Sequence, residues 1–268
     1  NILELNKLQK KEYFKIYKKN RYLNYNFGSA YLIAYRYFTK IKKHIKKKSK
    51  VLIIGDGLGI LSSMIYKTFK CKIYLCDLPE TLIYQQYFIS KNLNNINYQY
   101  IANSKDKLDF SKDFFFINAK ELNRLKIDLD LAINTDSFCE MDKVSVDNYF
   151  KYISDNLRKN GKFFYCNPIG LSGKGYKKPG DYPIGDIFKI DDIEVLYPSH
   201  RDTFCKYLAV SCSKKFLKKK NQNIKISLLR KKILNKYYDQ TEKIVTKITI
   251  NKIKKLSIEI SNDILKNN

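Results

Sequence analysis

The chain of 268 residues contains no tryptophan, only two histidines and no pair of cysteines separated by two residues. Its six cysteines are scattered through apolar stretches, so we expect neither a bound metal nor a disulfide framework. No apolar run approaches the ~20 residues that a membrane-spanning helix needs, and no basic-then-apolar leader is present. These absences favour a protein of the reducing cytoplasm that is neither exported nor inserted into a membrane.

Acidic residues are scarce relative to basic ones. The chain has 26 Asp and Glu and 52 Lys and Arg, which gives a net charge of +26. Residues 1–50 carry +13 and residues 213–268 carry +12, whereas residues 51–212 carry +1. Two explanations are open: a surface for a polyanion such as nucleic acid or anionic lipid, or a drift in composition toward Lys, Asn, Ile, Tyr and Phe. We favour drift, because the neutral middle carries the motifs described below.

The charge divides the chain into a helical N-terminal arm (1–50), a central domain (51–212) and a basic helical C-terminal extension (213–268). In the first arm apolar residues recur in steps of three and four, and Gly28 and Ser29 separate two expected helices. The last arm has an apolar stripe with lysines on the other face. Its members are Ile253, Leu256, Ile260 and Ile264. The arms are candidates for dimerisation helices, so a homodimer is a further expectation.

The central domain alternates between apolar runs and helix-like stretches. The runs cover residues 51–54, 73–76, 114–117, 129–133 and 163–166, and the helix-like stretches cover residues 60–69, 82–91 and 144–157. This order predicts an α/β fold with a doubly wound, mostly parallel sheet. Polar residues close four successive strands, at the sheet edge where such folds bind ligands. They are Asp77, Asn118, Asn134 and Asn167.

A glycine-rich loop, Gly-Asp-Gly-Leu-Gly from Gly55 to Gly59, follows the first strand and precedes a helix. Glycines let a ligand approach the backbone, and the free N–H groups of the helix favour negative charge. Asp77 closes the second strand 18 residues after Gly59, a spacing at which a carboxylate accepts hydrogen bonds from an adenosine ribose. A dinucleotide fingerprint would need glycine or alanine where the chain has Ile60.

The spacing of these glycines resembles motif I of class I S-adenosylmethionine (SAM) dependent methyltransferases. Across residues 74–168 the chain resembles bacterial sugar O-methyltransferases, typically associated with capsule and surface-glycan loci. The string Asp-Leu-Pro-Glu-Thr-Leu from Asp77 and the pattern N-x-x-S-x-x-E-M from Asn134 to Met141 carry this likeness. The resemblance implies a seven-stranded Rossmann-like methyltransferase sheet, to which the periodicity of the terminal segments adds helical arms.

The resemblance also implies which residues bind SAM. Gly55, Gly57 and Gly59 are expected around the methionine moiety, Asp77 and Leu78 at the ribose, and Asn118 at the adenine. The segment from Asn134 to Glu140 is expected to face the transferring methyl group. The full set of cofactor-binding candidates is Gly55, Asp56, Gly57, Gly59, Asp77, Leu78, Asn118, Ala119, Asn134 and Ser137. Ile53 departs from the pattern, because many members carry an acid there.

A hydroxyl acceptor must lose its proton during methyl transfer, so a general base is needed. Three candidates are open: His200 in a loop between the later strands, and Asp136 and Glu140 in the loop after the fourth strand. The segment 170–185 holds five of the ten glycines and suggests a mobile lid over the acceptor. Its lysines Lys174, Lys177 and Lys178 are candidates to contact a phosphate on the acceptor.

These features predict a SAM-dependent O-methyltransferase that acts on a small acceptor of surface-polysaccharide biosynthesis. The acceptor is expected to be a sugar hydroxyl or a phosphate-type group on an activated, anionic or nucleotide-linked precursor. One alternative is an RNA methyltransferase with basic arms, although the neutral core makes a nucleic-acid partner a weaker expectation. A second alternative is a non-catalytic SAM-binding scaffold.

Overall fold

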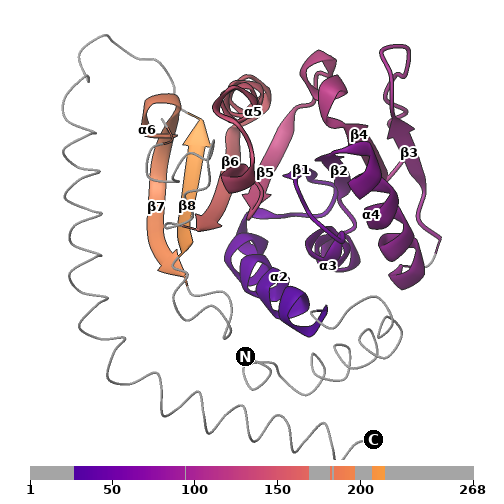
Figure 1. The fold of residues 1–268 in the computed structure, drawn as a ribbon, viewed down its shortest axis with the longest axis horizontal. Helices are drawn as coiled ribbons and strands as arrows, with labels where there is room; N and C mark the ends of the chain where they lie inside the picture. The colour runs from indigo at the N-terminus through magenta and orange to yellow at the C-terminus, as the bar shows by residue number, and fades with distance from the viewer. Residues whose placement is uncertain (1–26, 94, 169–181, 183, 197–206, 215–268) are drawn as a thin grey trace, which may run out of the picture. The chain divides into compact units, whose positions relative to one another are not determined.

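The computed structural model describes residues 27–93, 95–168, 182, 184–196 and 207–214. Within these residues one sheet has eight strands in the order β3-β4-β2-β1-β5-β6-β8-β7 (Figure 1). The strands are β1 (Lys50–Ile54), β2 (Lys72–Asp77), β3 (Tyr98–Ile101), β4 (Phe114–Asn118), β5 (Leu129–Thr135), β6 (Leu157–Pro168), β7 (Phe188–Leu196) and β8 (Tyr207–Lys214). The pairs from β3 to β6 are parallel, while β8 is antiparallel to both β6 and β7.

Helices cover both faces of this sheet (Figure 1). Three of them lie on one face: α2 (Phe27–Ile41), α3 (Ile60–Phe69) and α4 (Pro79–Asn92). The other face carries α5 (Lys143–Asn156), the short α6 (Ile184–Ile187) and the 3₁₀ turns η3 (Ala119–Arg124) and η4 (Phe138–Glu140). A further 3₁₀ turn, η2 (Lys42–His44), follows α2. The result is the doubly wound, Rossmann-like arrangement that the alternation of strands and helices predicts.

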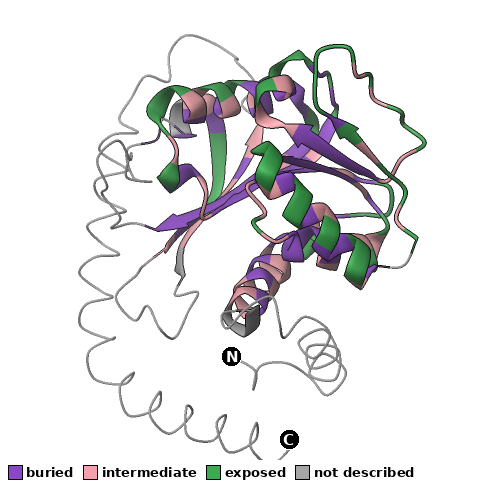
Figure 2. Cartoon of the chain, turned by 45° about the vertical axis from the view of Figure 1, so that its right-hand side comes forward, coloured by how far each residue is buried: buried purple, intermediate pink, exposed green. Residues whose placement is uncertain are grey.

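The apolar strands are buried because both of their faces are covered (Figure 2). Successive side chains of a strand point to opposite faces, so Val51 and Ile53 of β1 pack in the layer of α2, α3 and α4. Leu52 and Ile54 pack in the layer of α5 instead. All four side chains have 0% exposure. One strand therefore joins two hydrophobic cores.

The structure corrects the expected number of strands, because the described sheet has eight and not seven. The five predicted apolar runs match β1, β2, β4, β5 and β6, whereas β3, β7 and β8 lie outside these runs. The first of these, β3, is a four-residue edge strand that is parallel to β4. Its alternating, half-exposed sequence does not form the continuous apolar run that marks the central strands. The helix at residues 60–69 is confirmed, and α4 and α5 begin and end within three residues of their predicted bounds.

The described part of the N-terminal arm packs on the sheet. Tyr31, Tyr37 and Ile41 of α2 are buried in the core that α3 and α4 share. Gly28 and Ser29, expected to separate two helices, lie in the first turn of α2. Residues 1–26 and the stripe predicted for 253–264 lie outside the described residues, and the division into three segments stays a prediction. No helix in the described ranges is long and apolar enough to span a membrane.

Candidate functional site

A cavity of about 560 Å³ opens at the carboxyl ends of β1, β2, β4 and β5. Its walls come from the loops that follow these four strands and from the start of α5. The lining residues are Gly55, Gly57, Asp77, Leu78, Thr81, Ala119, Thr135, Asp136, Ser137, Glu140, Met141, Asp142, Ser145 and Tyr149. Six of the ten predicted cofactor residues are in this set, so the sheet edge gathers side chains that are far apart in the sequence.

The glycine loop forms one wall of the cavity and needs glycine for two different reasons. Gly55 has a φ of +74°, and a Cβ atom there would come within 2.2 Å of Oγ of Ser137. Gly57 has a φ of +58°, and a Cβ atom there would meet no heavy atom within 4 Å. Left-handed backbone disfavours other residues at both positions. The loop therefore packs tightly against the segment after β5 at Gly55 and leaves open space at Gly57.

Asp77 lies at the end of β2, where its carboxylate is held in place from two sides. The backbone N–H of Leu78 donates to Oδ1 at 2.9 Å, and Nε2 of Gln85 donates to Oδ2 at 2.8 Å. Burial raises the pKa of Asp77, and these hydrogen bonds and one from Thr81 oppose the shift, while the charge of Glu140 adds to it. Leu78 is 61% exposed beside this carboxylate. The Asp77 carboxylate, which accepts two hydrogen bonds, therefore lies next to the exposed apolar side chain of Leu78.

Asp136 lies in the loop after β5 with a φ of +63°, a left-handed conformation that is uncommon outside glycine. Oδ2 accepts a hydrogen bond from the hydroxyl of Tyr37 at 3.0 Å. Oδ1 is buried and has no hydrogen-bond partner among the described residues. Burial raises the pKa of Asp136 to about 6, although hydrogen bonding to Tyr37 and Tyr207 lowers it and the charge of Glu140 raises it further.

Asn134 belongs to a buried network under the cavity and is not among its lining residues. Its Nδ2 donates to the carbonyl of Ile54 at 3.1 Å and to Oγ of Ser137. Its Oδ1 accepts from Nδ2 of Asn167 at 2.7 Å, and Oδ1 of Asn167 accepts from the N–H of Cys139 at 3.2 Å. The two amides join the ends of β1, β5 and β6 to η4 and fix the loop that carries Ser137.

Asp56 and Asn118, also predicted to bind the cofactor, accept hydrogen bonds from the first turn of the helical element that follows each of them. Oδ2 of Asp56 accepts from the N–H of Ser62 at 2.9 Å, in the first turn of α3. Burial raises the pKa of Asp56 to about 7, and hydrogen bonds from Ser62 oppose this shift. Oδ1 of Asn118 accepts from the N–H of Lys120 at 3.2 Å and caps η3. Neither residue lines the cavity, whereas Ala119 does.

The charge of the cavity is opposite in sign to that of the whole chain. Its described lining contains four carboxylates and no lysine, arginine or histidine. The four are Asp77, Asp136, Glu140 and Asp142. Glu140 is exposed, and its charge raises the pKa of both Asp77 and Asp136. The negative potentials of these carboxylates add within the concave site, so the cavity favours a cationic ligand.

Five lining residues were not predicted as site residues: Thr81, Met141, Asp142, Ser145 and Tyr149. Two residues that hold carboxylates of the site also escaped prediction. Tyr37 reaches Asp136 from α2, although its sequence position is one of the apolar positions of a helical stripe. Gln85 holds Asp77 from the second turn of α4 and is 0% exposed. A buried polar residue inside a helix is a weak signal in sequence, because only the fold reveals its partner.

Several predicted functional residues lie outside the described residues. They are His200 and the lid lysines Lys174, Lys177 and Lys178. The C-terminal end of the predicted lid is described, since Tyr182 is 3% exposed and its hydroxyl donates to the carbonyl of Phe138 at 2.9 Å. The described residues contain no group of three or more His, Cys, Asp or Glu side chains that could hold a metal ion.

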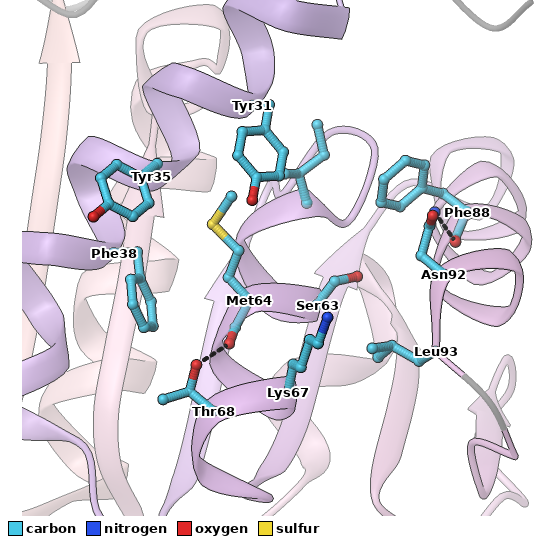
Figure 3. Close-up of a pocket in the computed structure, with 11 residues that line it drawn as sticks. Tyr31, Tyr35, Phe38, Ser63, Met64, Lys67, Thr68, Phe88, Asn92 and Leu93 are labelled. Atoms are coloured by element: carbon cyan, nitrogen blue, oxygen red, sulfur yellow. Dashed lines mark hydrogen bonds between the residues drawn. The ribbon is translucent and has the colours of Figure 1, made fainter. Parts of the chain in front are cut away.

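A second, smaller hollow of about 160 Å³ lies between α2, α3 and α4 and shares no lining residue with the acidic cavity (Figure 3). Tyr31, Tyr35 and Phe38 approach it from α2, opposite Met64 and Lys67 of α3. Its walls are mostly apolar, and they include none of the residues predicted to bind cofactor or acceptor. The acidic cavity is therefore the candidate functional site.

No protein-family model matches this chain, and no curated protein matches it. Several solved structures are similar to it. The TehB-like SAM-dependent methyltransferase from Corynebacterium glutamicum is 14% identical with a TM-score of 0.45, and the match covers 78% of this chain and 100% of that one. A SAM-dependent methyltransferase from Clostridium acetobutylicum is 16% identical with a TM-score of 0.46, covering 77% and 99% of the two chains.

A third similar structure is the geranyl diphosphate C-methyltransferase from Streptomyces coelicolor, in complex with Mg²⁺, geranyl diphosphate and S-adenosyl-L-homocysteine. It is 12% identical with a TM-score of 0.48, and the match covers 67% of this chain and 79% of that chain. These structures are methyltransferases by name.

Proposed function

We propose that the chain is a SAM-dependent O-methyltransferase, and the acidic cavity is the observation that carries the proposal. SAM has a sulfonium and an ammonium group, and the described lining offers four carboxylates and no cationic side chain. A dinucleotide would bring a pyrophosphate into the same negative field. The volume of about 560 Å³ is also within the range of small-ligand pockets, roughly 300–1,000 Å³.

The residues of the cavity fit the parts of SAM. Asp77, held by Leu78 and Gln85, would accept hydrogen bonds from the ribose hydroxyls. The exposed side chain of Leu78 and the methyl group of Ala119 would contact the adenine. The open space at Gly57 would admit the methionine end close to the backbone. Ile53 is fully buried, so Ser137 and the acidic lining would provide the anchoring that an acid at that position gives elsewhere.

Bound SAM supplies an activated methyl group whose departure from sulfur needs no acid. The chain must then align the acceptor, which is worth roughly 7–11 kcal/mol in well-oriented reactions, and remove the proton of a hydroxyl acceptor. We assign proton removal to Asp136. A pKa near 6 leaves it ionised yet basic at neutral pH, and its unpaired Oδ1 is a buried acceptor that a substrate hydroxyl would satisfy. Glu140 and His200 remain the alternative bases.

We further propose that the acceptor is a sugar hydroxyl of a surface-glycan precursor, in the cytoplasm. The Asp-Leu-Pro-Glu-Thr-Leu and N-x-x-S-x-x-E-M strings support the sugar class. The acidic lining favours a neutral hydroxyl over a phosphate oxygen as the reacting group, because a phosphate would meet like charge beside Asp136 and Glu140. A phosphate elsewhere on the precursor would have to lie outside this lining.

The test is to incubate the full chain with methyl-labelled SAM and a cell extract and to identify labelled products by mass spectrometry. We expect label on a sugar-containing small molecule with wild-type protein and not with the Asp136→Asn variant. Label in RNA would support the RNA methyltransferase instead. Tight SAM binding without label in any fraction would support the non-catalytic scaffold.

A further inference from the structure

Helix α2 brings a tyrosine hydroxyl to the proposed general base. The side chain of Tyr37 is 2% exposed, and its hydroxyl donates to Oδ2 of Asp136 at 3.0 Å. The helix itself is anchored by Ala34, Ile41 and the ring of Tyr37, which lies 6.4 Å from the ring of Phe164 on β6. The hydroxyl therefore approaches Asp136 from a fixed position.

We propose that Tyr37 is a positioning residue of the methyltransferase site, which orients the Asp136 carboxylate and stabilises its ionised form. This role rests on the proposed function. It makes α2 part of the active site, although the sequence assigns that helix to an arm. Tyr37 acts through Asp136, and it is not among the residues that line the acidic cavity.

The backbone of Asp136 is fixed independently of Tyr37. Its N–H donates to the carbonyl of Cys166 at 2.9 Å, and its carbonyl accepts from Sγ of Cys139 at 2.9 Å. The left-handed φ is thus held by β6 and η4. What these contacts leave undetermined is the rotation of the carboxylate. Hydrogen bonding from Tyr37, to Oδ2, and from Tyr207 orients the carboxylate. Oδ1 has no hydrogen-bond partner among the described residues and is the atom that can accept a proton.

The groups that face Asp136 come from four elements. Tyr37 on α2 and Tyr207 on β8 lower its pKa by hydrogen bonding, and Glu140 on η4 raises it by repulsion. Burial is the main cause that raises the pKa of the Cys139 and Cys166 thiols, and the nearby charge of Asp136 raises it further. Both thiols are therefore neutral at physiological pH. Hydrogen bonding to Tyr37 and Tyr207 therefore opposes the rise in the pKa of Asp136 that burial and Glu140 cause.

Removing the Tyr37 hydroxyl should make Asp136 harder to ionise. A hydrogen bond to a charged group corresponds to a shift of about one pH unit or more. In Tyr37→Phe we expect the acid limb of the pH–rate profile to move upward by about one unit, with the rate recovering at high pH and SAM affinity unchanged. A purely structural role would lower the rate at every pH alike.

Tyr31→Phe is the matched control, because Tyr31 is a buried tyrosine of the same helix that lines the hollow near α3 and not the acidic cavity (Figure 3). Its profile should coincide with that of the wild type. A second readout needs no SAM: the Asp136 carboxyl carbon is titrated by NMR in ¹³C-aspartate-labelled protein and assigned through Asp136→Asn. Its midpoint should rise in Tyr37→Phe and stay constant in Tyr31→Phe.

The outcomes separate the two claims. Wild-type protein that transfers no methyl group overturns the proposed function, and the role of Tyr37 with it, whatever the NMR titration gives. An active wild type whose acid limb and Asp136 midpoint are both unchanged in Tyr37→Phe overturns the role of Tyr37 alone. A shift of the same size in Tyr31→Phe also overturns it, because the effect would then come from the packing of α2.

Discussion

Replacing Asp136 by asparagine should lower activity and raise stability. In the folded protein the pKa of Asp136 is raised from 3.8 to about 6, mainly by burial. The folded state therefore binds more protons than the unfolded state between these pH values, and the free energy of unfolding falls as pH rises through this window. Above this window the carboxylate is ionised in both states, and the free energy of unfolding is roughly 3 kcal/mol lower than it is below the window, where the carboxyl is neutral in both states.

Asparagine has the same shape and still offers Tyr37 an acceptor oxygen, but it carries no charge. We expect Asp136→Asn to be more stable than the wild type by up to about 3 kcal/mol at pH 7.5, with the difference shrinking toward pH 4. Urea unfolding at a series of pH values measures this difference. Methyl transfer should fall by about 10²- to 10⁴-fold, the usual contribution of a general base.

Asp142→Asn is the matched control, because Asp142 lines the same cavity but has a lowered pKa, chiefly through the backbone hydrogen bond from Ser145. Its carboxylate stabilises the folded state above the unfolded pKa, and this contribution is lost as pH falls through the folded value. Asp142→Asn should therefore gain no stability at neutral pH. An equal gain in both variants, or an Asp136→Asn difference that does not change with pH, would show that the buried charge of Asp136 does not destabilise the fold.

Two further substitutions test the cofactor walls of the cavity. Gly55→Ala places a Cβ atom 2.2 Å from Oγ of Ser137 at a φ of +74°, so we expect a lower melting temperature and loss of SAM binding. An unchanged melting curve would contradict the close approach. Gln85→Leu removes the 2.8 Å hydrogen bond to Asp77 and should weaken SAM binding roughly tenfold or more, measured by titration. The control is Gln86→Leu, because the amide of Gln86 donates to Ser90 on the same helix. This variant should bind SAM like the wild type.

Five of the eight described strands, β1, β2, β4, β5 and β6, could be predicted because they form the middle of the sheet and are buried on both faces. A run such as residues 51–54 is continuously apolar, which marks the strand clearly in the sequence. In the structure all four residues have 0% exposure. The edge strand β3 could not be predicted in the same way. Only one side of it pairs within the described sheet, and its residues are half-exposed.

The candidate site could be predicted in outline, since polar residues at strand ends and a glycine loop meet at one sheet edge. The role of each polar residue could not be predicted, because the same sheet edge also exposes backbone N–H and C=O groups that need hydrogen-bond partners. Asn134 accordingly bonds the carbonyl of Ile54, and Asp56 bonds the N–H of Ser62. The contact between Tyr37 and Asp136 joins distant parts of the chain and requires the packed fold.

Binding of SAM in the acidic cavity through Asp77 is measured by isothermal titration calorimetry. We expect one SAM site on the wild type, an affinity reduced at least roughly tenfold in Asp77→Ala, and no change in Asp109→Ala, which removes an exposed carboxylate outside the cavity. Wild-type protein that gives no heat with SAM, or an Asp77→Ala variant that binds as tightly as the wild type, would contradict SAM binding through Asp77.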